Sequence, residues 1–365
     1  MQINAFYRRS TASGDVAQLF AAVSTPSSRK AADAASPGSN VMFRARFEST
    51  LPVSQKNALA KIIAILAGQN PGSLISGIAD IEGRLAHVVE GTDGADTIAY
   101  AGGNAGSRQL SSYIDAGRGD DVISFASVGS GYHEISGGDG NDAIAASAQF
   151  FSSVDGGNGN DAIAVAGEWV ISVQGGSGNN AIAVAGSIVN DVGGGEGDDV
   201  ISVAGGYVGW VEGGAGNDTI SVSSGNSQYY KGGSPSDLLT IHGTKRGVTV
   251  EGGKGNDTIS IGGEGYVISH AGDGQDVIAI SDRTEFEFLG EKWNDKLPSL
   301  KDATFVQENG TLTVTFAGRD DRLTIQAGGR EMKVEQIWDS KFVVTLVDAA
   351  AAPPPAPTAS ADPAP

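Results

Sequence analysis

The chain has 365 residues, of which 54 are glycine and none is cysteine, and its formal net charge is −19. Glycine does not recur at every third position, which excludes collagen, and without cysteine there is no disulfide framework and no Cys-based zinc or redox site. Between residues 90 and 281 there are 24 acidic and 6 basic residues, a net charge of −18. This segment repels nucleic acid and anionic lipid headgroups and attracts cations, so nucleic acid is not an expected partner.

Residues 1–88 have a mixed composition and contain the clearest helix pattern. Ser54 precedes a run of helix-forming residues that is followed by Gly68 and Pro71, which is typical of a capped helix. This N-terminal region is therefore predicted to be partly helical. Its first ten residues lack the apolar run and cleavage site of a signal peptide, and no apolar stretch reaches the length of a membrane-spanning helix, so we expect neither.

Residues 89–281 contain ten copies of a glycine- and aspartate-rich motif. After two longer steps of 25 and 21 residues, successive copies start 19 residues apart, with a single step of 20. The copies begin at Gly91, Ala116, Gly137, Gly156, Gly175, Gly194, Gly213, Gly232, Gly252 and Ala271. A constant period of this length indicates a solenoid in which each repeat forms one coil.

Between the motifs, apolar residues alternate with small polar ones, as in strands with one buried face. Each coil is predicted to run turn, strand, turn, strand, and the 19-residue step aligns apolar residues into three inward columns. The first column is Ile98, Ile123, Ile144, Ile163, Ile182, Ile201, Ile220, Leu239, Ile259 and Ile278; the second is Val165, Val184, Val203, Val222, Ile241, Ile261 and Ile280; the return strands supply Val154, Val173, Val192, Val211, Tyr230 and Val250. The predicted fold class is mainly β, a parallel β-roll or β-helix solenoid, because one coil cannot bury its apolar face alone.

Residues 282–348 have a different β-rich pattern, without the glycine motif. Short alternating runs such as 311–316 and 342–346 predict strands. We expect this unit to cap the end of the solenoid, which otherwise exposes unpaired strand edges. Residues 349–365 are rich in alanine and proline and are predicted to be a disordered tail.

The repeated turn has the residues of a calcium site. Ca²⁺ takes six to eight oxygen ligands, backbone carbonyls included. Glycines at positions 1, 2 and 4 of the motif permit positive φ, so the backbone can curl and direct its carbonyls to one point. The aspartate at position 6 adds a carboxylate, and two turns stacked one coil apart can enclose an ion together. Several Ca²⁺ ions are therefore the expected ligands.

The iterated motif Gly-Gly-x-Gly-x-Asp-x-apolar-x resembles the repeats-in-toxin (RTX), or haemolysin-type, calcium-binding family over about 190 residues. The resemblance implies that the position-6 carboxylates bind metal, together with carbonyl groups of the neighbouring glycine turns. The carboxylates are those of Asp96, Asp121, Asp142, Asp161, Asp199, Asp218, Asp237, Asp257 and Asp276; the glycines include Gly138, Gly157, Gly195, Gly214 and Gly253.

Three departures from the family pattern change what is expected. Only one half of each coil keeps the motif, which predicts ions along one side of the solenoid. Asn180 replaces an aspartate and removes a charge. Pro235 stands at position 4 of its turn, where a residue with positive φ is needed and proline cannot supply it. Weak or empty sites are expected around Asn180 and Pro235.

The family resemblance implies an extracellular protein that leaves by type I secretion. The first hypothesis is a non-enzymatic structural or adhesion protein that folds on meeting external calcium, with cell-surface or matrix components as candidate partners. Two alternatives stay open. One is an ice-binding solenoid, although the mixed, charged residues at position 3 match an ice lattice poorly. The other is an export module of an enzyme whose active site is not recognisable; no HExxH pair, GxSxG elbow or phosphate loop is present.

Overall fold

A computed structural model describes residues 77–81, 84–102, 111–127, 131–270, 272–289 and 300–347. The predicted N-terminal helix and the predicted disordered tail lie outside these residues. Within them the regular structure is β-strand, apart from the short 3-10 helix η3 (Leu300–Asp302). No helix in this part of the chain is long and apolar enough to cross a membrane.

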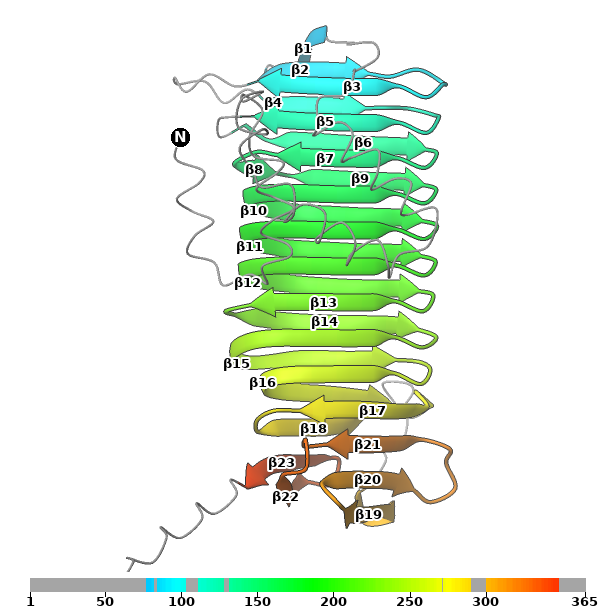
Figure 1. The fold of residues 1–365 in the computed structure, drawn as a ribbon, viewed down its shortest axis with the longest axis vertical. Helices are drawn as coiled ribbons and strands as arrows, with labels where there is room; N and C mark the ends of the chain where they lie inside the picture. The colour runs from blue at the N-terminus through cyan, green and yellow to red at the C-terminus, as the bar shows by residue number, and fades with distance from the viewer. Residues whose placement is uncertain are drawn as a thin grey trace, which may run out of the picture.

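Each coil contributes one strand directly after its glycine-rich turn, and these strands pair in parallel in chain order (Figure 1). Along strands such as those over residues 122–127 and 219–224, buried residues alternate with less buried ones, because one face of the strand packs on the core and the other faces outward. The strands of this first stack are β3 (Thr97–Gly102), β5 (Val122–Ser127), β7 (Ala143–Ser147), β13 (Thr219–Ser224) and β17 (Gln275–Ile280), with the first halves of β10 (Ala162–Ser177), β11 (Ala181–Glu196), β12 (Val200–Ala215), β15 (Leu238–Gly253) and β16 (Thr258–His270).

The second halves of the long strands return to the next turn and form an opposite stack. Here β2 (Arg84–Glu90) already pairs in parallel with β4 (Ser111–Asp115) from Ala86 on, so the stacking starts before residue 89. β18 (Thr284–Leu289) pairs in parallel with β16, so the stacking continues beyond residue 281. β1 (Gly77–Ile81) pairs antiparallel with β2. The other members are β2 (Arg84–Glu90), β4 (Ser111–Asp115), β6 (His133–Asp139), β8 (Phe150–Phe151), β9 (Ser153–Asn158), β14 (Ser227–Ser234) and β18 (Thr284–Leu289).

The core lies between the two stacks and consists of the predicted columns. In the first, Ile163, Ile182 and Ile201 are register partners in successive coils, and every member of the three columns is 5% exposed or less. The prediction of a parallel solenoid with these inward residues is confirmed. Burying a Val or Ile side chain stabilises by about 1.5–3 kcal/mol, and each coil depends on its neighbours for that burial.

One histidine belongs to this core. His133, at the start of β6, is fully buried, and its ring centroid lies 4.9 Å from that of Phe125 and 6.0 Å from that of Phe151. Neither ring nitrogen has a hydrogen-bond partner. Burial lowers the pKa of His133 to about 4, because the surrounding rings solvate the charged form poorly. His133 is therefore a neutral core residue at neutral pH.

The C-terminal strands cover the edges of the last coil (Figure 1). β21 (Arg322–Gln326) pairs in parallel with β17, and β23 (Lys341–Val347) pairs antiparallel with β18. Through this pairing Ile325 extends the Ile278 column, and Phe342 stacks on Phe286 with ring centroids 5.0 Å apart. This unit consists of β19 (Ala303–Glu308), β20 (Thr311–Phe316), β21 (Arg322–Gln326), β22 (Glu331–Trp338) and β23 (Lys341–Val347).

Candidate functional site

The glycine-rich turns stack along one edge of the solenoid, and glycine is needed at different positions for different reasons. At positions 2 and 4 the backbone has positive φ, for example 111° at Gly195 and 109° at Gly197, which side chains rarely tolerate. Position 1 does not have positive φ, so the prediction that it does is wrong. A Cβ at Gly194 would lie 2.3 Å from Oδ2 of Asp199 and 2.5 Å from the carbonyl oxygen of Gly213. At Gly194 the carboxylate and the next coil therefore leave no space for a side chain, although Ala116 and Ala271 stand at position 1 of their turns.

The position-6 residues form a continuous ladder of side chains, which we call the aspartate ladder. In each step Oδ1 accepts a hydrogen bond from the backbone N–H of the position-6 residue one coil earlier; Asp199 N–H, for example, donates to Asp218 Oδ1 at 2.8 Å. The ladder comprises Asp96, Asp121, Asp142, Asp161, Asn180, Asp199, Asp218, Asp237, Asp257 and Asp276. The structure thus brings every predicted carboxylate into one row.

The second carboxylate oxygen in the middle of this row has no hydrogen-bond donor. It is buried and unpartnered in Asp161, Asp199, Asp218, Asp237 and Asp257, whose side chains are 3% exposed or less. Such oxygens are costly to bury unless a proton or a cation compensates them. The ladder therefore has an unmet demand for positive charge.

The surroundings of these oxygens add to the need for positive charge. Beside five position-1 glycines, Oδ2 of the same turn and the position-1 carbonyl oxygen of the next coil lie close together; these are Gly137, Gly156, Gly194, Gly213 and Gly232. Burial raises the carboxyl pKa to about 8 in Asp199 and Asp257, and to about 7 in Asp161 and Asp218. The backbone N–H bond lowers these pKa values, and in Asp199 the side chain of Asn180 lowers the pKa as well, while neighbouring carboxylates raise them further. Two converging acceptors attract a cation, or retain a proton when none is present.

The first turn differs from the middle ones. Oδ2 of Asp96 accepts hydrogen bonds from the backbone N–H of Thr92 at 2.6 Å and from its hydroxyl at 2.9 Å. In this turn, Oδ2 therefore has hydrogen-bond donors from within the turn itself, which the middle turns lack. Asp96 belongs to the ladder, but the need for a cation is weaker there.

The predicted position-2 glycines close the turn rather than face the carboxylate. The position-2 carbonyl of Gly117 accepts from the backbone N–H of Asp139 at 2.8 Å, and that of Gly233 from Lys254 at 2.9 Å. A Cβ on any of the five predicted glycines would lie 1.8–2.1 Å from the position-2 carbonyl oxygen of the preceding coil. These glycines, Gly138, Gly157, Gly195, Gly214 and Gly253, allow the turns to stack.

Asn180 shows what the aspartates lack. Its Oδ1 accepts from Asp161 N–H at 2.9 Å, so it continues the ladder. Its Nδ2 donates to the carbonyl of Gly178 at 3.0 Å and to that of Gly194 at 3.4 Å. An N–H group thus occupies the place that Oδ2 has in the other coils. The Asn180 amide therefore donates hydrogen bonds to the carbonyl oxygens at this place, which a carboxylate cannot do.

The turn with Pro235 keeps its place in the ladder. Asp237 Oδ1 accepts from Asp218 N–H at 2.7 Å. Burial raises the pKa of Asp237 to about 6, and its Oδ2 is one of the unpartnered oxygens. The substitution at position 4 therefore leaves the carboxylate row unbroken.

A second ladder at position 5 was missed by the sequence analysis. Here a side-chain oxygen accepts from the position-5 backbone N–H of the following coil, the opposite direction to the aspartate ladder; Asp198 N–H, for example, donates to Asn179 Oδ1 at 2.7 Å. The recurring Asn or Asp at this position was the available signal. Its members are Asp120, Asn141, Asn160, Asn179, Asp198, Asn217, Ser236, Asn256 and Gln275.

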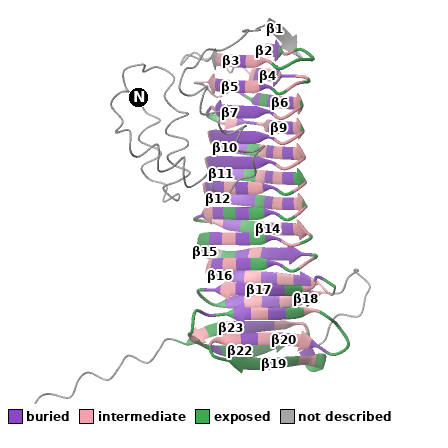
Figure 2. Ribbon diagram, turned by 45° about the vertical axis from the view of Figure 1, so that its right-hand side comes forward, coloured by how far each residue is buried: buried purple, intermediate pink, exposed green. Residues whose placement is uncertain are grey.

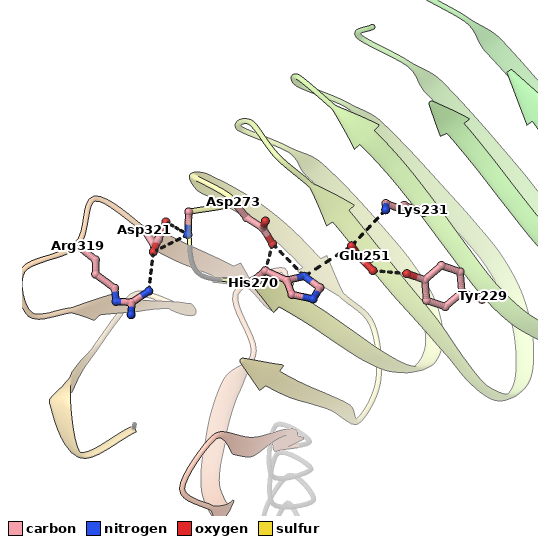
Figure 3. Close-up of polar contacts among 8 residues, drawn as sticks. Tyr229, Lys231, Glu251, His270, Asp273, Arg319 and Asp321 are labelled. Atoms are coloured by element: carbon pink, nitrogen blue, oxygen red, sulfur yellow. Dashed lines mark hydrogen bonds and ion pairs between the residues drawn. The ribbon is translucent and has the colours of Figure 1, made fainter. Parts of the chain in front are cut away.

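A separate polar cluster lies where the last coils meet the C-terminal unit (Figure 3). Glu251 Oε1 lies 3.6 Å from both Lys231 Nζ and His270 Nδ1, and its other oxygen accepts from the Tyr229 hydroxyl. His270 Nδ1 is also 3.7 Å from Asp273 Oδ2. Burial raises the pKa of Asp273 to about 6. Since cationic and anionic groups are paired here, the cluster is a structural network with no unmet demand for a metal.

The donor set of the aspartate ladder suits a hard cation with mixed ligands. Among the described residues no three His, Cys, Asp or Glu side chains come close enough to hold a metal by themselves. An ion at the ladder must therefore take many of its ligands from backbone carbonyls, which Ca²⁺ accepts readily and Mg²⁺ less so. The unpartnered Oδ2 atoms and the converging position-1 carbonyls fit this requirement.

Fold and site together define a parallel β-solenoid with a buried carboxylate ladder along one edge. No protein-family model matches the chain, and no curated protein matches it. Among solved structures, the extracellular lipase LipA from Serratia marcescens is similar, with 17% identity and a TM-score of 0.20. The similarity covers 66% of this chain and 38% of the lipase chain, so the present chain matches well under half of that protein.

Proposed function

We propose that the protein binds several Ca²⁺ ions along the edge formed by its glycine-rich turns. The observation that carries this proposal is the row of buried, unpartnered Oδ2 atoms, which in Asp161, Asp199, Asp218 and Asp237 lie beside a carbonyl oxygen of the next coil. Asp161, Asp199, Asp218 and Asp237 would hold the ions with the position-1 carbonyls of the following coils, and Asp257 would contribute its carboxylate to the same row. Bound calcium would supply the positive charge that these oxygens lack.

The role that follows is structural. Each ion would join two successive coils, so metal binding and coil stacking would stabilise each other. The nonapeptide's resemblance to RTX repeats and the net charge of −18 over residues 90–281 support calcium-dependent folding. In this proposal the protein is an exported, non-enzymatic structural or adhesion protein that stays unfolded at low cytosolic calcium and folds outside the cell.

Isothermal titration calorimetry with CaCl₂, after exhaustive chelation at pH 7.5, tests the binding. We expect several calcium ions per chain and little heat from an equal concentration of MgCl₂. Elemental analysis after gel filtration should give the same calcium stoichiometry. Equal binding of both ions, or binding of neither, would contradict the proposal.

A further inference from the structure

The outer surface of the first stack has an unusual composition in its middle coils. In β7 and the first halves of β10 and β11, the outward positions alternate with the inward ones and are alanine, except for Ser147 at the end of β7. A solvated sheet face carries polar residues, and the later coils have them at the register-equivalent positions, such as Thr219 and Ser221. We call the outward residues Ala143, Ala145, Ala162, Ala164, Ala166, Ala181, Ala183 and Ala185 the alanine face.

The alanine face is buried although it points away from the core. Its side chains are 7% exposed or less, whereas Thr219, Ser221 and Thr258 on the same sheet are exposed. Figure 2 shows this buried colouring across β7, β10 and β11. Among the described strands, β7, β10 and β11 mainly contact the strands of adjacent coils within the same stacks. An apolar sheet face of this kind requires a covering partner.

We propose that the N-terminal segment, residues 1–76, docks on the alanine face through residues 54–67. In the helix expected there, Leu59, Ile62, Ile63 and Leu66 have the spacing i, i+3, i+4 and i+7 and form one apolar stripe. Flat alanine side chains let such a stripe approach the sheet closely. Residues 1–76 contain 8 basic and 3 acidic residues, a net charge of +5, against −18 for residues 90–281, so attraction adds to the apolar contact.

The connection is long enough. The segment leads into β1, which pairs with β2 of the second stack. From β1 through β2 and β4 to β6 is three strand spacings, about 14 Å at about 4.8 Å each, and packed sheets lie about 10 Å apart. Residues 68–76, which join the expected helix to β1, can span up to about 30 Å. A helix over residues 54–67 would be about 21 Å long, which exceeds the roughly 16 Å that the alanine face extends along β10 and β11. The segment can therefore reach the face within the same chain.

The absence of cysteine from the sequence makes a direct test simple. Ala164→Cys places a thiol on the alanine face, and Ser221→Cys is a matched control, because both positions lie in one register column of the same stack. In the full chain with excess calcium, the thiol of Ala164→Cys should react with a small uncharged maleimide at least ten times more slowly than the thiol of Ser221→Cys. Equal rates would overturn the proposal.

The occupant is identified by a second cysteine. Leu59→Cys combined with Ala164→Cys should form an intrachain disulfide under mild oxidation, and Leu59→Cys combined with Ser221→Cys should not. A disulfide-linked dimer would mean that a second copy covers the face, and equal cross-linking of both pairs would mean that the contact is unspecific; either result overturns the proposal. If circular dichroism shows that Ala164→Cys is misfolded, Ala183→Cys in the same column replaces it.

Discussion

The side-chain amide of Asn180 donates from Nδ2 to the carbonyl oxygen of Gly194 across one coil step, at 3.4 Å. In neighbouring coils an unpartnered carboxylate oxygen has the equivalent place, as Oδ2 of Asp199 does beside Gly213. One position in the ladder therefore meets its own requirement for positive charge, and its neighbours do not. This contrast is the basis for the first prediction.

Asp199→Asn should make the stacking of the coils at this position independent of calcium. The new amide can donate to the Gly213 carbonyl, as Asn180 does to Gly194, and one buried charge is removed. In excess chelator the folded state should gain about 1–3 kcal/mol, seen as more β-structure by circular dichroism. At saturating calcium the variant should bind fewer ions by elemental analysis.

The matched control is Asp198→Asn, which removes the same charge one residue away. Asp198 is exposed and accepts from Asn217 N–H at 2.7 Å, a contact that asparagine can keep. This variant should behave like the parent protein in both measurements. If the two variants are indistinguishable, net charge alone governs calcium dependence and the ladder geometry does not.

Gly194→Ala should damage the site without changing any charge. The added Cβ would lie 2.3 Å from Asp199 Oδ2 and 2.5 Å from the Gly213 carbonyl oxygen, so the two coils must separate. We expect a loss of about 2–4 kcal/mol in unfolding free energy at saturating calcium, measured by urea denaturation. Gly225→Ala is the control, because its Cβ would meet nothing closer than 3.4 Å; an equal loss there would contradict the steric explanation.

His133 should make the solenoid less stable in acid. Burial lowers its folded-state pKa to about 4, against about 6.5 in the unfolded chain. The unfolded state therefore binds the proton more readily, and this contribution is present above pH 6.5 and is lost as pH falls to 4. The loss should be on the order of 3 kcal/mol.

The comparison of the parent protein with His133→Phe isolates this effect. Urea unfolding at saturating calcium, at several pH values between 4 and 7, should show that the parent loses stability relative to the variant as pH falls. The exposed His242 provides the control, and His242→Phe should follow the parent. Parallel curves for the parent and His133→Phe would contradict the assignment of His133 as a neutral core residue.

The C-terminal unit should keep the solenoid monomeric. β21 and β23 occupy the edges of β17 and β18, and uncovered edges pair with other chains. A chain ending at residue 299 should therefore form end-to-end oligomers, measured by light scattering after size-exclusion chromatography. A truncated chain that stays folded and monomeric would show that the edges need no cover.

The fold was predictable because the sequence repeats one simple pattern. A 19-residue step and a two-residue alternation place Ile163, Ile182 and Ile201 in one column, with no other consistent register. Hydrophobic burial is insensitive to fine geometry, so the columns followed from residue type and spacing alone. The expected helices of the N-terminal region lie outside the described residues and stay predictions.

The detail of the site was harder to predict, because hydrogen-bond direction is not encoded in spacing. Position 1 seemed to need positive φ, but Gly194 instead makes room for a carboxylate. The position-5 ladder of Asn179 and Asp198 was missed, because those residues were treated as variable. The role of Asn180 was read as a lost charge, whereas its amide supplies the missing donor. Each of these depends on which atom faces which across a coil step.

A calcium titration followed by far-UV circular dichroism tests the central claim most directly. Starting in excess chelator at pH 7.5, the protein should have little β-structure, gain a strong β signal as free calcium rises, and fail to do so with magnesium. A chain that is fully β-structured in chelator, with no metal found by elemental analysis, would show that the carboxylate row is stable without any cation and would contradict calcium-coupled folding.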